Sequence, residues 1–136
     1  MLPLIAILAL SHFDLAAYEQ PRLIREADSV LGVQPKTIVA AVNPRSAGGL
    51  HDWSSEGDYW WPDPSHPDGP YIQRDGLTNP GNFVAHRELM LDFVRAYDAL
   101  AAAYRVTGDE RYAAAAVRHL HAWYVDPATR MNPDLQ

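Results

Sequence analysis

The sequence contains no cysteine, which excludes disulfide bonds, thiolate metal ligands and a cysteine nucleophile together. It has one lysine, Lys36, against ten arginines, and its net charge is -6. Nucleic-acid binders gain most of their affinity from clustered cationic side chains, so this charge excludes a general nucleic-acid binder. No apolar run approaches the roughly 20 residues that cross a bilayer, and we expect no membrane span. A chain of 136 residues, 48% of them hydrophobic, suits one folded domain.

The longest apolar run, Leu2 to Leu10, has the length of the middle of a secretory signal peptide. Ala9-Leu10-Ser11 provides a small-x-small cleavage pattern, but only the N-terminal amine precedes the run. We therefore assign residues 1–11 to a signal peptide that is clipped at its front, and expect a periplasmic or secreted protein. A buried first helix has the same composition and remains an alternative.

Two helical segments are predicted before residue 36. Asp14 caps a short helix that runs through Gln20, and Pro21 starts the next, because the missing N–H of proline is tolerated at a first helical position. Gly32 ends this second helix. Its apolar stripe consists of Leu23, Ile24, Ala27, Val30 and Leu31.

The C-terminal third has the pattern of two antiparallel helices. Asn82 is placed to cap a long helix, Gly108 stops it, and Asp109 starts a second that ends at Asp126-Pro127. Their apolar stripes are Leu89, Phe93, Tyr97, Leu100 and Tyr104 in the first, and Tyr112, Ala116, Leu120 and Trp123 or Tyr124 in the second. The sequence therefore predicts an αα-hairpin. Alanine-rich stretches allow its helices to approach closely.

Between these helical parts lies a long segment of different composition. Ile38 to Val42 is predicted to be an extended buried connection, and residues 43–82 hold six of the eight glycines and six of the eleven prolines. Five aromatic residues lie in the same stretch, so disorder would leave a large apolar area in water. We expect an ordered, irregular, aromatic-rich loop and no strand ladder anywhere. Its aromatic residues are Trp53, Tyr59, Trp60, Trp61 and Tyr71.

Aromatic, basic and polar residues alternate in this loop, which suits a sugar ligand. Trp60 and Trp61 are the natural platform for a sugar ring; plugging the core is the alternative role, and adjacent positions can each take one. Asp52, Glu56 and Asp58 could supply the paired carboxylates of a helical-toroid glycoside hydrolase. Carboxylates in glycine-rich loops more often accept backbone hydrogen bonds. No metal site is assigned, because the aspartate spacing does not match a calcium loop.

Four segments resemble the N-terminal part of the alginate lyase superfamily of bacterial polysaccharide lyases. They are Ser46 to Pro64 (SAGGLHDWSSEGDYWWPDP), Gly69 to Gly76 (GPYIQRDG), Asn79 to Phe83 (NPGNF) and Tyr124 to Pro133 (YVDPATRMNP). The resemblance runs from about Phe13 to the end, so residues 12–136 are assigned to the N-terminal portion of such a domain. It implies an all-α fold, a partial α/α toroid of helical hairpins, with secretion to the periplasm and β-elimination of 4-linked uronic acids.

The reaction that the resemblance implies needs a cation for the uronate carboxylate, a base for H5 and an acid for the leaving O4. Arg45 or Arg74 can pair the carboxylate, His51 can hydrogen-bond it, and Tyr59 or Tyr71 can work near O4. We take Arg45, His51, Trp60, Trp61 and Arg74 as candidate substrate-binding residues, with His51 and Tyr59 as weak catalytic candidates. The resemblance places the family's main catalytic groups beyond Gln136.

The sequence therefore predicts the N-terminal, substrate-binding part of a polysaccharide lyase that acts on alginate or a related polyuronate and has little activity by itself. No cofactor is implied. A non-catalytic carbohydrate-binding module that uses Trp60 and Trp61 is the second hypothesis. A glycoside hydrolase with Asp52 or Asp58 as acid or base is the third.

Overall fold

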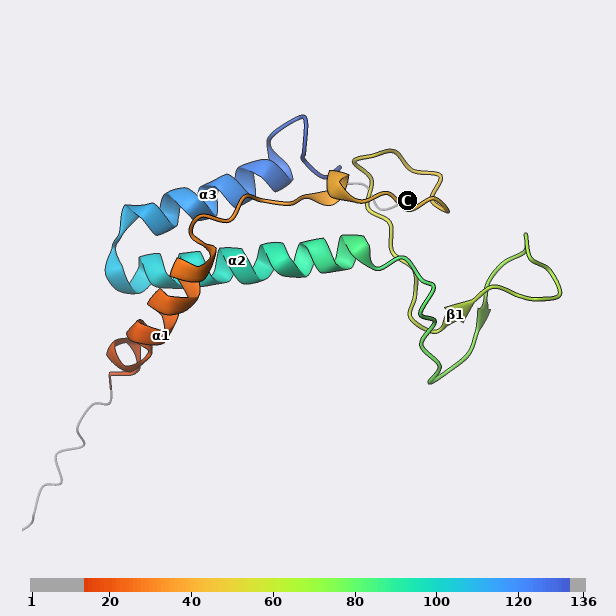
Figure 1. Ribbon diagram of the computed structural model, residues 1–136, viewed down its shortest axis with the longest axis horizontal. Coiled ribbons are helices and arrows are strands. Elements are labelled where there is room, and N and C mark those ends of the chain that lie inside the picture. The colour runs from red at the N-terminus through yellow and green to blue at the C-terminus, as the bar shows by residue number, and fades with distance from the viewer. Residues whose placement is uncertain (1–13, 133–136) are drawn as a thin grey trace, which may run out of the picture.

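The computed structural model describes residues 14–132, and the apolar run Leu2 to Leu10 lies outside them. Three helices form one end of the molecule, and the long loop with a small hairpin projects from the other (Figure 1). The helices are α1 (Leu15–Val30), α2 (Ala85–Thr107) and α3 (Glu110–Tyr124), with a 3₁₀ turn η1 (Ile38–Ala40). In residues 14–132 no helix is long and apolar enough to cross a membrane. The predicted all-α class is confirmed for the described part of the chain.

Helix α1 is one continuous helix, and the predicted break at Pro21 is wrong. Its N-cap is Asp14 as expected, whose carboxylate accepts from the N–H of Ala17 at 3.0 Å. Pro21 costs the helix one backbone hydrogen bond. Arg22 bridges the turns on both sides of that position, because its guanidinium pairs with Glu19 at 2.5 Å and with Glu26 at 2.7 Å. These ion pairs and the packing of α1 on α2 keep the helix continuous across Pro21.

The αα-hairpin is confirmed, with one correction at its start. Gly108 ends α2 in the left-handed conformation at φ 70°, and Asp109 caps α3 by accepting from the N–H of Arg111 at 2.9 Å. The residue before the first turn of α2 is Val84, not Asn82. Asn82 is buried and points into the loop, where its amide has other partners.

The core consists of two clusters along the helices. The first joins all three helices and relies on alanine, which lets their backbones approach closely. Its buried members are Ala27, Leu100, Ala103, Tyr112, Ala115 and Ala116. The second cluster packs Ile38 against Phe93 and Trp123. Ile38 is thus buried as predicted, although the segment that carries it forms a 3₁₀ turn instead of an extended connection.

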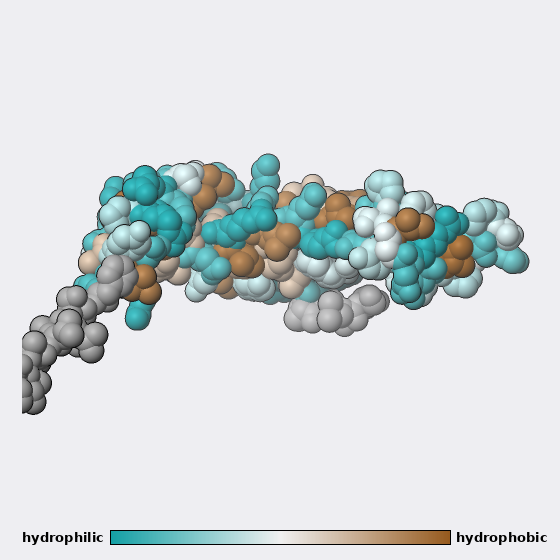
Figure 2. All heavy atoms as spheres, turned by 90° about the horizontal axis from the view of Figure 1, so that it is seen from below, coloured by the Kyte–Doolittle hydropathy of each residue, from teal (hydrophilic) through white to brown (hydrophobic). Residues whose placement is uncertain are grey.

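The long loop contains a short strand ladder, contrary to the prediction of none. Strand β1 (Trp60–Trp61) pairs antiparallel with β2 (Ile72–Gln73), with Trp60 opposite Gln73 and Trp61 opposite Ile72. Two residues per strand give almost no periodic signal, which explains why sequence pattern missed it. Seen from below, hydrophobic side chains reach the surface on the helical body and on this loop end (Figure 2). Polar contacts between its residues hold the loop in place.

Candidate functional site

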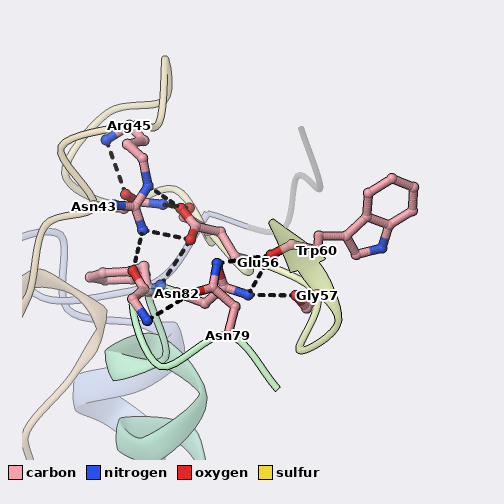
Figure 3. Close-up of polar contacts among 10 residues, drawn as sticks. Asn43, Arg45, Glu56, Gly57, Trp60, Asn79 and Asn82 are labelled. Atoms are coloured by element: carbon pink, nitrogen blue, oxygen red, sulfur yellow. Dashed lines mark hydrogen bonds and ion pairs between the residues drawn. The ribbon is translucent and has the colours of Figure 1, made fainter. Parts of the chain in front are cut away.

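The Glu56 carboxylate is the central acceptor of the loop (Figure 3). It accepts from Arg45 Nε at 2.8 Å and Nη2 at 2.6 Å, from Asn43 Nδ2 at 3.1 Å and from the N–H of Phe83 at 2.9 Å. The Arg45 guanidinium also donates to the carbonyl of Gly81 at 3.0 Å. One side chain therefore ties the start of the loop to its end.

The charge of Glu56 is strongly favoured in the folded protein. Its hydrogen bond to Arg45 is the main cause, and the pKa of Glu56 falls to about 2 although partial burial opposes the shift. Arg45, a predicted uronate ligand, has its guanidinium occupied by this bidentate pair. Its direct contact with substrate stays a prediction.

Two asparagines at the end of the loop hold the base of the hairpin. Asn82 donates to the carbonyl of Gly57 at 2.6 Å, and Asn79 donates to the carbonyl of Trp60 at 2.9 Å and to the Asn82 side chain at 2.8 Å. The N–H of Asn79 also donates to the carbonyl of Asp58 at 2.8 Å. These contacts fix the orientation of β1 relative to the loop that carries Glu56 (Figure 3).

The hairpin presents the two tryptophans differently. Trp60 is 44% exposed, and its side chain extends away from the polar network (Figure 3). Trp61 is half-buried: its indole N–H donates to the carbonyl of Leu77 at 2.9 Å, and the guanidinium carbon of Arg74 lies 5.2 Å from its ring centroid. This distance places Arg74 in cation–π range of Trp61. The structure thus brings Trp61 and Arg74 together on the hairpin.

Gly57 sets the position of Trp60, because a Cβ at residue 57 would overlap Cδ1 of the indole. We therefore expect Gly57→Ala to displace the Trp60 ring while the helices stay folded. Tryptophan fluorescence should shift, and far-ultraviolet circular dichroism should not. Gly32→Ala is the matched control, since nothing lies within 4 Å of a Cβ there. Equal spectra for both variants would show that Gly57 does not set the indole position.

The tyrosine candidates lie on the same hairpin. Tyr59 is 44% exposed and precedes β1, and its carbonyl accepts from the N–H of Arg74 at 2.8 Å. Tyr71 precedes β2 and is half-buried. Both tyrosines therefore lie on the hairpin segments that carry Trp60, Trp61 and Arg74.

His51 lies in a different group, at the C-terminal segment of the described chain. Its Nδ1 lies 2.7 Å from the carbonyl oxygen of Arg130 and must donate, since a carbonyl only accepts. This bond fixes the tautomer and leaves Nε2 as a hydrogen-bond acceptor. The N–H of Asn132 donates to the carbonyl of His51 at 2.8 Å, and its amide donates to Asp52 at 2.7 Å. The predicted substrate ligands therefore lie in three places. Arg45 belongs to the Glu56 network, His51 contacts this C-terminal segment, and the hairpin carries Trp60, Trp61 and Arg74.

The carboxylates proposed for a glycoside hydrolase all have other partners. Asp52 accepts from Asn132 and from the N–H of Gly49, and these bonds lower its pKa, with Asn132 the larger cause. Asp58 pairs with Arg87 at 2.8 Å. A general acid needs a raised pKa, whereas those of Asp52 and Glu56 are lowered. The geometry does not favour this alternative.

His86 is a site residue that sequence reasoning missed. It is 3% exposed at the start of α2, its Nδ1 accepts from the N–H of Ser54 at 3.0 Å, and its Nε2 donates to the carbonyl of Ala41 at 3.0 Å. Phe83 packs edge-on against the ring at 4.7 Å. A neutral imidazole thus joins three loop segments to the helix. Its partners lie 32 and 45 residues away in sequence, so no local spacing indicates them.

A large concavity lies elsewhere, between α1 and α2. It has a volume of about 770 Å³ and is lined by residues of the three helices, among them Phe93 and His119, and by the segment that follows α1. His119 is buried, which lowers its pKa. Within residues 14–132 no group of three or more histidine or acidic side chains is placed to hold a metal ion. The chemistry-bearing groups cluster on the loop, so we place the candidate site there and not in the larger groove.

Comparison with known proteins agrees with the resemblance seen in the sequence. The alginate lyase family model matches residues 37–136. A crystal structure of an alginate lyase from Bacteroides ovatus is 41% identical, with a TM-score of 0.70 over 86% of this chain. The match covers 31% of that enzyme, so the chain spans about a third of its length. No curated protein is significantly similar to the chain. On the family match and this structural likeness, the chain belongs to the alginate lyase family.

Proposed function

We propose that this chain is the substrate-binding N-terminal part of a polysaccharide lyase and holds a 4-linked polyuronate on its β1–β2 hairpin. One observation carries the proposal: the Arg74 guanidinium lies over Trp61 and has no ion-pair partner within residues 14–132. A cation beside aromatic faces fits a sugar that has an apolar ring face and a carboxylate. The alginate lyase from Bacteroides ovatus supports a uronate as the sugar.

The hairpin can serve β-elimination in a defined way. A cation at the C5 carboxylate makes H5 more acidic, because it stabilises the charge that develops when the proton leaves. Arg74 is the residue for this contact, and exposed Trp60 is the residue to stack on a sugar ring. The fixed tautomer of His51 gives Nε2 the capacity to accept a hydrogen bond or a proton. Tyr59 is the hairpin phenol open to a leaving oxygen.

We expect Arg74→Ala and Trp60→Ala each to weaken binding of alginate oligomers by about 1–3 kcal/mol. Tryptophan fluorescence titration or calorimetry on the 136-residue chain measures this loss. Arg95→Ala is the matched control, because Arg95 is an exposed arginine on α2, away from the hairpin. Equal affinity in all three variants would contradict the proposed site. Unfolding of Trp60→Ala would instead assign Trp60 to the core.

Catalysis is tested separately by ultraviolet absorbance of the unsaturated uronate product. We expect little or no product when the chain alone is mixed with alginate, and a form extended by further family sequence should produce it. Product from the chain alone would place the catalytic groups among its own residues, with His51 and Tyr59 the first to replace. Reducing sugar without an unsaturated product would instead indicate hydrolysis.

A further inference from the structure

The β1–β2 ladder divides the hairpin into two opposite faces. Trp60 lies opposite Gln73. In the next pair along, the N–H of Arg74 donates to the carbonyl of Tyr59 at 2.8 Å. Because successive residues of a strand point to opposite sides, Trp60 and Gln73 lie on one face of the ladder. Trp61 and Arg74 lie on the other, in agreement with the 5.2 Å between the Arg74 guanidinium carbon and the Trp61 ring centroid.

The first of these faces consists of Trp60, Gln73 and Asp75, and we call it the Trp60 face. Asp75 belongs to it because it follows Gln73 by two residues and accepts from Gln73 Nε2 at 2.7 Å. All three side chains are exposed. Gly57 fixes the indole, since a Cβ at residue 57 would overlap Cδ1 of Trp60. Side chains directly opposite in a ladder are neighbours, so the Trp60 face is a fixed aromatic ring beside two polar groups.

The polar groups of the Trp60 face act as hydrogen-bond acceptors. The Gln73 amide uses Nε2 to donate to Asp75, which leaves its Oε1 as an acceptor, and a carboxylate only accepts. A ligand of this face must therefore supply donors, and the charge of Asp75 repels a ligand carboxylate. Sugar hydroxyl groups are such donors, and the C–H side of a sugar ring stacks on an indole. The Trp60 face suits a sugar unit held by its hydroxyl groups.

The other face has the opposite preference, because Arg74 supplies a cation that pairs with a carboxylate. We propose that the hairpin contacts two units of one polyuronate chain, one on each face. Gln73 and Asp75 determine how the unit on Trp60 is oriented, with its hydroxyl groups toward the protein and its carboxylate away from it. The inference rests on the proposed function and deepens it, since it assigns Trp60 and Arg74 to different sugar units.

The test follows the indole N–H signals of the 136-residue chain by heteronuclear NMR, with two probes. Alginate hexamers carry carboxylates, whereas carboxyl-reduced alginate hexamers carry a neutral alcohol at the same carbon. The native hexamer should shift the signals of both Trp60 and Trp61. The reduced hexamer should shift the Trp60 signal and leave the Trp61 signal in place, because Arg74 has no carboxylate to bind. If the reduced hexamer shifts Trp61 as much as Trp60, or shifts neither, the proposal is overturned.

Variants of the two faces test the roles of the polar residues. Gln73→Ala and Asp75→Ala should each weaken binding of the reduced hexamer about threefold to tenfold, because each removes a hydrogen-bond acceptor. Arg74→Ala should weaken binding of the native hexamer and leave that of the reduced hexamer unchanged. Gln34→Ala is the matched control, because Gln34 is an exposed glutamine outside the hairpin and should change neither affinity.

The outcomes separate this inference from the proposed function. If Arg74→Ala and Trp60→Ala both bind the native hexamer as tightly as the original chain, the proposed function fails. If Arg74→Ala weakens the native hexamer while Gln73→Ala and Asp75→Ala bind the reduced hexamer as tightly as Gln34→Ala, the proposed function is supported and the assignment of the Trp60 face is wrong.

Discussion

Glu56→Ala should lower the free energy of unfolding by about 2–3 kcal/mol. The change removes the acceptor of two Arg45 bonds and leaves the buried Asn43 amide and the Phe83 N–H without it. The loss is smaller than for a fully buried pair, because the Arg45 side chain is 44% exposed. Urea unfolding measures the loss, and hydrogen exchange at the Phe83 amide locates it. The alginate titration should weaken as well, since the same network orients the hairpin.

Glu26→Ala is the matched control for Glu56. Glu26 also pairs with an arginine, Arg22 at 2.7 Å, but both side chains are about half exposed. An exposed pair contributes about 0–1 kcal/mol, so the control should lose little stability. Equal losses in the two variants would mean that the Glu56 network does not hold the loop.

The same carboxylate predicts how stability responds to acid. Its pKa is lowered from 4.5 to about 2 in the folded state, so the folded state favours the charged form. This stabilisation is fully present above pH 4.5 and is lost as the pH falls toward 2. Glu56→Gln removes this contribution, so the stability gap between the original chain and the variant should narrow over that interval. A gap that stays constant from pH 5 to pH 2 would contradict the assignment.

Trp123→Ala should lower the free energy of unfolding by about 3–5 kcal/mol, the largest loss expected for a single substitution. Trp123 is 0% exposed, packs 5.3 Å from the Phe93 ring centroid and joins α3 to Ile38. Its carbonyl also accepts from the N–H of Met131 at 2.8 Å, so its movement loosens the segment that His51 contacts. Thermal and urea unfolding measure the effect.

Two further variants test whether the loss of stability in Trp123→Ala comes from the buried aromatic ring. Trp123→Phe should cost less stability than Trp123→Ala, because it keeps an aromatic ring and removes a buried indole N–H that has no hydrogen-bond partner among residues 14–132. Val117→Ala, on the same helix but 59% exposed, should stay within about 0.5 kcal/mol of the original chain. If Val117→Ala lost as much stability as Trp123→Ala, the assignment of Trp123 to the buried side of α3 would be wrong.

Some of the predicted substrate ligands already have polar partners within residues 14–132, and others do not. Arg45 is held by Glu56, and His51 is held at Nδ1 by Arg130. Trp60 is 44% exposed, and Arg74 lies over Trp61 on the same hairpin. We therefore regard the hairpin as the part of the site to test first for substrate contact.

The sequence by itself determined the helices, because helix signals are local. Asp14 and Asp109 cap the helices that the pattern assigned to them, Gly108 ends α2, and the spacing of apolar residues predicted the αα-hairpin. The motifs of the loop also identified the family, which comparison with known proteins confirmed. Pro21 misled the prediction, since long-range packing outweighs the loss of one hydrogen bond.

Only the tertiary structure decided what the loop does with its polar residues. Glu56, Asn82 and His86 have partners up to 45 residues away, and no sequence period records such distances. The β1–β2 ladder is two residues long on each side, too short for a periodic signal. Buried polar groups must find partners wherever the fold brings them, so those partners appear only once the helices have packed. Because of that packing, Arg45 is paired with Glu56, whereas the Arg74 guanidinium stays open to a ligand.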